Sequence, residues 1–146
     1  MLNGKVRRSL ALLGAGMVCL ATVSVVDAQI KKGKTRVMKT AQWMKGVMKP
    51  QCEALKKGLD GRPSNDEEWE ALAASAALIN EASYLLMDDG RCPDGVWAEA
   101  ASKTLRNGSA DVLKAIEAKD ISAAKNAFGG MTKACAACHD KHREKK

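Results

Sequence analysis

The stretch "DISAAKNAFGGMTKACAACHDKH" at residues 120–142 decides the fold predicted for this chain. Its apolar residues recur three and four positions apart, the spacing that places side chains on one face of an α-helix. Asp120 precedes the run and can cap the helix, because its carboxylate accepts hydrogen bonds from the first free backbone amides. An apolar face of this kind has to be buried against other helices. The residues predicted to face inward are Ile121, Ala124, Phe128, Met131, Cys135 and His139.

Three more helical lengths precede this one. They are separated by clusters of Gly, Pro, Asn and Asp, residues that break helices and favour turns. The clusters are "GLDGRPSND" (58–66), "DDGRCPDG" (88–95) and, more weakly, "EAKD" (117–120). Four amphipathic helices joined by short loops predict an all-α fold, an antiparallel up-down-up-down four-helix bundle.

The helix boundaries follow from local signals. The first helix begins in the upper thirties, and Pro50 predicts a kink or restart because proline donates no backbone hydrogen bond. Ser64 and Glu67 predict a capping box for the second helix, and the third follows Asp94. The remaining inward residues are predicted to be Val37, Ala41, Met44, Val47, Met48, Cys52, Leu55 and Leu59 in the first helix, Trp69, Leu72, Ala73, Ala76, Asn80, Ser83, Tyr84 and Met87 in the second, and Trp97, Ala101, Thr104, Leu105, Gly108, Val112 and Ile116 in the third.

The amino terminus carries the pattern of an export signal. Basic residues precede the apolar run at residues 10–26, and Val26-Asp27-Ala28 offers a cleavage site before Gln29. This pattern predicts a cleaved signal peptide over residues 1–28 and a single helical domain over residues 29–146. A retained membrane anchor is the alternative, since the run nearly spans a thin bilayer. We expect an exported, periplasmic protein with no stable membrane association once the signal is removed.

The charge balance is basic, with 24 Lys and Arg against 17 Asp and Glu, a formal net charge of +7. The only dense basic cluster is the terminal "DKHREKK" at residues 140–146, which reads as a solvated helix end or as a docking patch for an acidic redox partner. No aromatic residues alternate with the basic ones, so nucleic-acid binding is not expected. No self-complementary patch can be identified, which leaves a homodimer open.

The chemistry of the chain is concentrated in Cys135, Cys138 and His139, a C-x-x-C-H motif. In an exported protein this spacing predicts attachment of one covalent haem c, because two thiols one helical turn apart can add to the two vinyl groups of haem and the next imidazole can bind the iron. The rivals are a redox C-x-x-C, which normally opens a helix after a strand, and a zinc site, which needs two more ligands. Neither context is found in the sequence.

With this motif near the carboxyl end of a four-helix chain, the sequence resembles the class II cytochromes c, which include cytochrome c′ and the cytochrome c556 type. Members commonly continue C-H-x-x-aromatic-R, and here Asp140, Lys141, His142 and Arg143 follow at that spacing. His142 replaces the usual aromatic residue. The resemblance implies that Cys135 and Cys138 attach the haem, that His139 is the proximal ligand and that Arg143 lies near the haem.

The same resemblance implies two functions that differ in the sixth ligand of the iron. A methionine from the first helix makes an electron carrier that serves redox proteins, whereas an apolar residue leaves the iron five-coordinate and able to bind nitric oxide or other small gases. Substrate turnover is not expected in either case, so the chain is not predicted to be an enzyme. In an antiparallel bundle the end of the last helix lies beside the start of the first, which favours Met44 over Met38 and over Met48, one turn farther along.

Cys52 and Cys92 are the other two cysteines of the predicted mature chain. An oxidising compartment favours a disulfide between them, but their expected separation along the bundle exceeds the limit for such a bond unless a kink at Pro50 or an inward loop closes the gap. The sequence leaves open whether they pair or are small buried apolar residues.

Overall fold

The computed structural model describes residues 34–143, which form an all-α bundle as predicted. The predicted signal peptide at residues 1–28 lies outside the described residues. The first helical length comprises α1 (Thr40–Trp43), η1 (Met44–Met48) and α2 (Lys49–Gly61), and the second is α3 (Asp66–Met87). The third comprises α4 (Gly95–Glu99), η2 (Ala100–Leu105) and α5 (Arg106–Glu117). The fourth is α6 (Ile121–His142).

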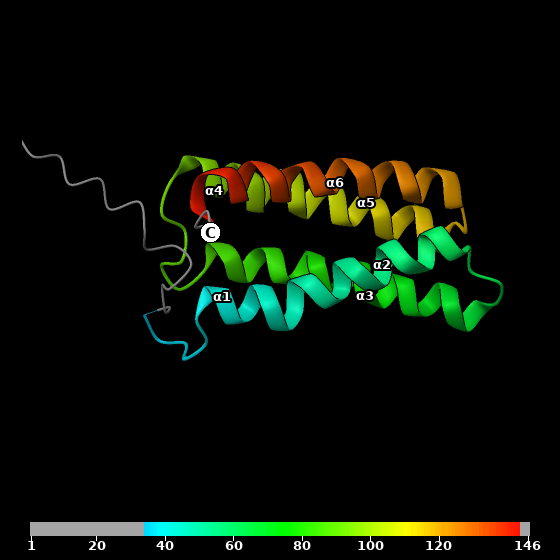
Figure 1. Cartoon of the computed structure of the whole chain (residues 1–146), viewed down its shortest axis with the longest axis horizontal. Helices are drawn as coiled ribbons and strands as arrows, with labels where there is room; N and C mark the ends of the chain where they lie inside the picture. Colours follow the sequence, from blue (N-terminus) through cyan, green and yellow to red (C-terminus); the bar gives the residue numbers. More distant parts are fainter. Residues whose placement is uncertain (1–33, 144–146) are drawn as a thin grey trace, which may run out of the picture.

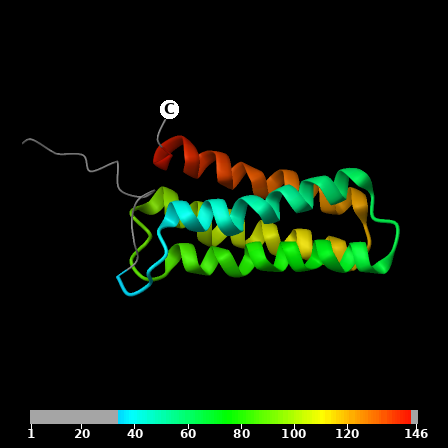
Figure 2. The same ribbon diagram turned by 60° about the horizontal axis from the view of Figure 1, so that its bottom comes forward.

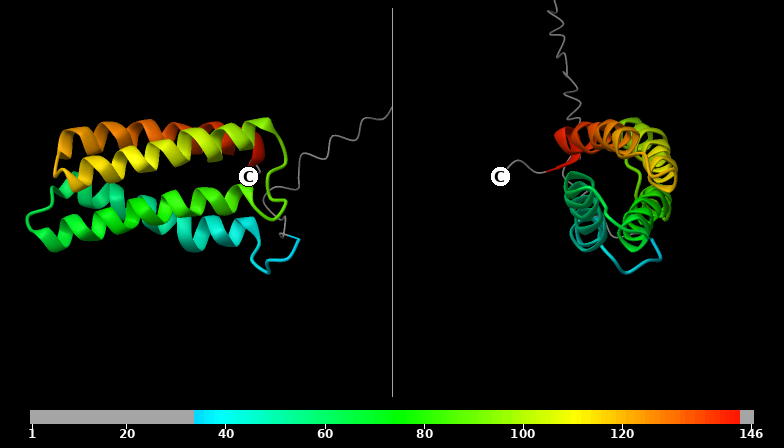
Figure 3. Two further views of the ribbon diagram at one scale, coloured as in Figure 1. Left: turned by 180° about the vertical axis from the view of Figure 1, so that it is seen from behind. Right: turned by 90° about the vertical axis from the view of Figure 1, so that its right-hand side faces the viewer.

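The colours of Figure 1 show that consecutive lengths run in opposite directions along the bundle, and the end-on view of Figure 3 shows the four lengths surrounding a common axis. The end of α6 therefore lies at the same end of the bundle as the start of α1 and as α4, as Figure 2 also shows. No helix among residues 34–143 is long and apolar enough to cross a membrane. This shared end brings the C-x-x-C-H motif and the first helical length together.

Two segments of the bundle, η1 and η2, are wound as π-helix instead of α-helix. In η1 the amide of Lys49 donates to the carbonyl of Met44, five residues back. Pro50 occupies the first turn of α2, where its missing amide hydrogen is tolerated. The predicted restart at Pro50 is thus a change from π-helix to α-helix one residue earlier. Wide turns of this kind are frequent at functional sites, because they re-aim side chains within a helix.

Side-chain caps begin the second, third and fourth lengths. The predicted capping box of Ser64 and Glu67 is wrong by one position: Asn65 is the N-cap and accepts from the Glu68 amide, while the Glu68 carboxylate accepts from the amide and hydroxyl of Ser64. Asp94 caps α4, because its carboxylate accepts from the Trp97 amide. Asp120 caps α6 as predicted, and accepts from the amides of Ser122 and Ala123.

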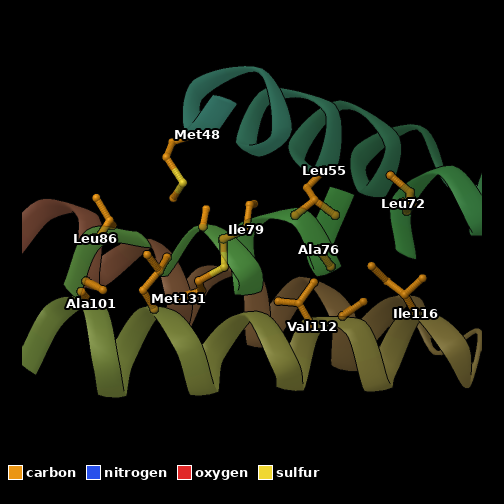
Figure 4. Packing of buried hydrophobic residues seen from close by; sticks show 14 of the residues in the cluster. Met48, Leu55, Leu72, Ala76, Ile79, Leu86, Ala101, Val112, Ile116 and Met131 are labelled. Carbon is orange, nitrogen blue, oxygen red and sulfur yellow. The ribbon is translucent and has the colours of Figure 1, made fainter. Parts of the chain in front are cut away.

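The core of the bundle is a continuous cluster of buried aliphatic residues, in which Leu, Ile, Val and Met alternate with Ala (Figure 4). Three residues predicted to face inward do not. Val37 is 81% exposed because it precedes the first helix, and Thr104 is exposed. Tyr84 is 50% exposed because its ring lies against the guanidinium of Arg106, whose carbon is 3.6 Å from the ring centroid.

The segment before α1 is held against the loop that follows α3. Asp89 accepts hydrogen bonds from the backbone amides of Thr35 and Arg36 and from the Thr35 hydroxyl. Buried Arg91 donates to the carbonyl of Met38 over 2.9 Å. These contacts fix where α1 begins, and therefore set the height of the first helical length at this end of the bundle.

Candidate functional site

A cavity of about 650 Å³ opens at the end of the bundle where α6 finishes and the first helical length starts. This volume falls within the range of about 300–1,000 Å³ that is usual for small-molecule and cofactor sites. Its wall is mainly apolar and comes from all four helical lengths. The lining residues are Ala41, Met44, Lys45, Met48, Lys49, Cys52, Glu53, Lys56, Leu86, Trp97, Ala100, Ala101, Leu105, Phe128, Thr132, Ala134, Cys135, Cys138, His139 and Arg143.

The wall supplied by α6 contains every predicted haem-binding residue of the carboxyl-terminal motif. Cys135, Cys138 and His139 line the cavity and are half-buried, and exposed Arg143 lines it one turn beyond His139. Their spacing on one helix explains the arrangement, because residues three and four apart share a helical face. The structure therefore gathers two thiols, an imidazole and a guanidinium on one side of a single apolar cavity.

The wall supplied by the first helical length contains two of the three candidate methionines. Met44 and Met48 both line the cavity, as does Cys52 one turn farther along. Met48, expected one turn farther along than Met44, also lines the cavity, and its side chain points into the bundle in Figure 4. Met38 does not line the cavity; it precedes α1 and is 42% exposed. Trp43 and Val47, on the same helical length, are not among the lining residues.

The two motif thiols lie in surroundings that favour their protonated form. Burial raises the pKa of Cys135, and it raises the pKa of Cys138 to about 11, with smaller contributions from Cys135, Asp94 and Cys92. Both residues are near the end of α6, away from the positive end of the helix dipole that activates redox thiols. These thiols thus lack the lowered pKa on which thioredoxin-like C-x-x-C chemistry depends.

Cys52 and Cys92 are both free thiols, so the disulfide that the sequence left open is not formed in this structure. Burial raises the pKa of Cys52 to about 11, and the nearby charge of Cys135 contributes. The Sγ of Cys92 lies 3.4 Å from the carbonyl oxygen of Asp94, within reach of a weak hydrogen bond.

His139 is held in the form that binds metals. Burial lowers the pKa of its imidazole, and the positive charge of Arg143 lowers it further, while Asp140 opposes the shift. A lowered pKa keeps the imidazole neutral near pH 7, with one nitrogen lone pair available to a metal ion. The same burial that makes the cavity apolar therefore prepares His139 as a ligand.

Sequence reasoning missed two parts of the site. Lys45, Lys49 and Lys56 line the cavity and are exposed, so its mouth is mainly cationic, with Glu53 as the carboxylate on this helix. Lys49 and Glu53 form an ion pair of 3.6 Å. The signal was present in the sequence, since these lysines lie beside the Met44–Cys52 face at helical spacing, but charged residues on a helix usually indicate only a solvated face.

The second missed part is the surroundings of His142. Its ring is 7% exposed and packs edge-on against the indole of Trp97, with the ring centroids 5.4 Å apart and the planes at 77°. The usual aromatic residue of the resembled family is thus replaced by an imidazole that still packs against a ring. Trp97 itself lines the cavity, so His142 supports the wall of the site from behind.

Comparison of the chain with protein-family models, with curated proteins and with solved structures found no match. Among residues 34–143, no three His, Cys, Asp or Glu side chains are grouped as the ligands of a metal ion would be. The chemistry of the site therefore has to be inferred from its residues: an apolar cavity, two protonated thiols, a neutral imidazole and two thioethers on the opposite wall.

Proposed function

We propose that this chain is an exported monohaem c-type cytochrome that carries single electrons between redox proteins. The observation that carries the proposal is the convergence of Cys135, Cys138 and His139 with Met44 and Met48 on one apolar cavity. The likeness of the motif and its helical setting to the class II cytochromes c supports it. Haem, when bound, supplies an iron that changes between two oxidation states.

Different residues of the chain would attach the haem and bind its iron. Cys135 and Cys138 would attach it through two thioether bonds, and His139 would bind the iron from the α6 side. Met44, on the opposite wall, is the sixth ligand that we propose, since axial His and Met together raise the reduction potential and suit electron transfer. Arg143 would face the negatively charged propionates, because its guanidinium lines the cavity just beyond the end of α6.

The apolar wall has a role of its own. Leu86, Trp97 and Leu105 line the cavity from the second and third helical lengths. A low-polarity wall limits the access of water to the iron and makes each interaction with its charge stronger. We expect these residues to exclude competing small ligands as long as a methionine occupies the sixth position.

Visible spectra of the full chain, matured by cells that attach haem to cytochromes, test the proposal. We expect covalent haem and a low-spin spectrum in the wild type, and we expect carbon monoxide to change that spectrum slowly. In Cys135→Ser or Cys138→Ser, haem can no longer be attached through two thioether bonds. Met44→Ala should give a high-spin spectrum and rapid carbon monoxide binding, whereas the neighbouring Val47→Ala should leave the spectrum unchanged.

Three other results would redirect the assignment. A chain that acquires no Soret absorption contradicts haem attachment. A low-spin spectrum that survives in Met44→Ala but is lost in Met48→Ala would assign the sixth ligand to Met48. A high-spin wild type that binds carbon monoxide rapidly would favour the alternative function, a five-coordinate, cytochrome c′-like protein that binds nitric oxide.

A further inference from the structure

The proposed ligand His139 lies in a part of its helix that is intrinsically weak. α6 ends at His142, so Cys138 and His139 belong to its last two turns. Helix ends fray, since the last four carbonyls have no partner within the helix. A site on such a turn cannot hold its geometry without a contact from outside the helix.

The structure provides that contact through His142. The His142 ring is buried edge-on against Trp97. Trp97 is itself fixed, because its indole Nε1 donates to the Leu86 carbonyl over 2.7 Å in the buried core. The last turn of α6 is therefore packed against a side chain that cannot shift without breaking a buried hydrogen bond.

Asp94 adds a polar contact to the same turn. Its Oδ1 accepts from the Trp97 amide over 3.0 Å and lies 3.3 Å from His142 Nε2, while its Oδ2 lies 2.8 Å from Lys141 Nζ. The Lys141 hydrogen bond, with that of the Trp97 amide, lowers the pKa of Asp94 to about 2, so the carboxylate stays charged. The His142–Asp94 contact is not aligned as a hydrogen bond, and Nε2 has no acceptor among the described residues.

We propose that His142, Trp97 and Asp94 form a latch that positions the haem-binding turn of α6 against the cavity wall. His142 is a positioning residue in this inference: it acts on Cys138 and His139 through the helix and on the cavity through Trp97. The ring packing supplies most of the effect, because the ring is buried whereas the Lys141–Asp94 pair is partly exposed and contributes little. The link to haem rests on the proposed function, but the latch itself does not.

The latch predicts a distinct order among four variants. His142→Ala removes the ring and the polar contact of Nε2 with Asp94, whereas His142→Phe keeps a ring against Trp97 and removes only that polar contact. Asp94→Asn keeps an N-cap oxygen for α4, since Asn caps helices as well as Asp does, and removes the carboxylate. Lys141→Ala removes the exposed ion pair alone and is the matched control on the neighbouring position.

Hydrogen exchange of backbone amides in the haem-free full chain measures the first consequence. We expect His142→Ala to increase exchange in residues 138–143 by tenfold or more, His142→Phe to restore it to within about threefold of the wild type, and Lys141→Ala to leave it unchanged. Equal exchange in the wild type and in His142→Ala would overturn the latch. If His142→Ala fails to fold, the exchange of His142→Phe tests the latch instead. Unprotected amides at residues 138–143 in that folded variant would also overturn the latch.

The haem-loaded protein gives the second readout. His142→Ala should change the reduction potential and the low-spin spectrum, and His142→Phe should restore both, which a general loss of stability would not produce. A spectrum and potential that do not move in His142→Ala would contradict positioning of the site. Failure of the chain to take up haem would contradict the proposed function and leave the exchange result as the test of the latch.

Discussion

The four cysteines of the described chain differ in their surroundings more than in their spacing. Cys52, Cys135 and Cys138 line an apolar cavity, and burial is the first cause of the raised pKa of each. Cys92 lies outside that lining, in the loop before α4. The residues that could react with oxidants or alkylating agents are thus kept protonated by the same cavity that would receive a cofactor.

Alkylation of the haem-free chain should be slow at Cys52 and Cys138. With a pKa of about 11 against an ordinary 9.0, their thiolate fraction at pH 8 is lower by roughly two orders of magnitude, and the thiolate is the reacting form. Peptide mapping after a timed pulse of iodoacetamide at pH 8 measures this. We expect labelling at these two positions at least tenfold slower in the folded chain than in the chain unfolded by denaturant, and rising steeply above pH 9. Equal rates in the two states would contradict the burial of these thiols.

At the scale of the elements, α6 carries the functional motif and depends on contacts at both of its ends. Asp120 begins it by accepting two backbone hydrogen bonds, and the His142 contact with Trp97 holds its last turn. Between them, Gly108 lets α5 approach closely, since a Cβ built there would lie 3.1 Å from the Met131 Cα. α6 is therefore positioned by three separate features: the Asp120 cap, the close approach of α5 at Gly108, and the packing of His142 against Trp97.

Removal of the cap should weaken the fold by a measurable amount. Asp120→Ala leaves the amides of Ser122 and Ala123 without their acceptor, so we expect the free energy of unfolding to fall by about 1 kcal/mol. Asp120→Asn retains an acceptor oxygen and should lose less than half as much. Urea denaturation of the haem-free chain compares the two. A loss that is the same for both variants would show that charge, rather than capping, is responsible.

The whole molecule has two unlike ends. Away from the motif the bundle is filled by residues such as Leu59, Val112 and Ile116, all fully buried. At the other end the helical lengths enclose the cavity, and the side chains there face it instead of each other. A bundle built in this way places stability at one end and leaves the other able to accommodate a cofactor.

Substitution of a buried core methionine and of a cavity-lining methionine should give different losses of stability. Met131 is 0% exposed in the buried core, so Met131→Ala should lower the free energy of unfolding by about 2–5 kcal/mol. Met44 already faces the cavity, so Met44→Ala in the haem-free chain removes fewer contacts and should cost less than about 1 kcal/mol. Thermal and urea unfolding of both variants measure this. A Met44→Ala loss as large as that of Met131→Ala would mean that the cavity is closed in solution.

The sequence by itself determined the all-α bundle, the Asp120 cap and the composition of the α6 wall, because helical periodicity and the C-x-x-C-H spacing are local properties of the chain. Only the tertiary structure decided what lies opposite that wall. It left Cys52 and Cys92 as free thiols, placed lysines at the mouth of the cavity and buried His142 against Trp97. These features depend on the rotation and height of one helix against another. A one-residue change in helical winding alters both, and no local sequence pattern encodes them.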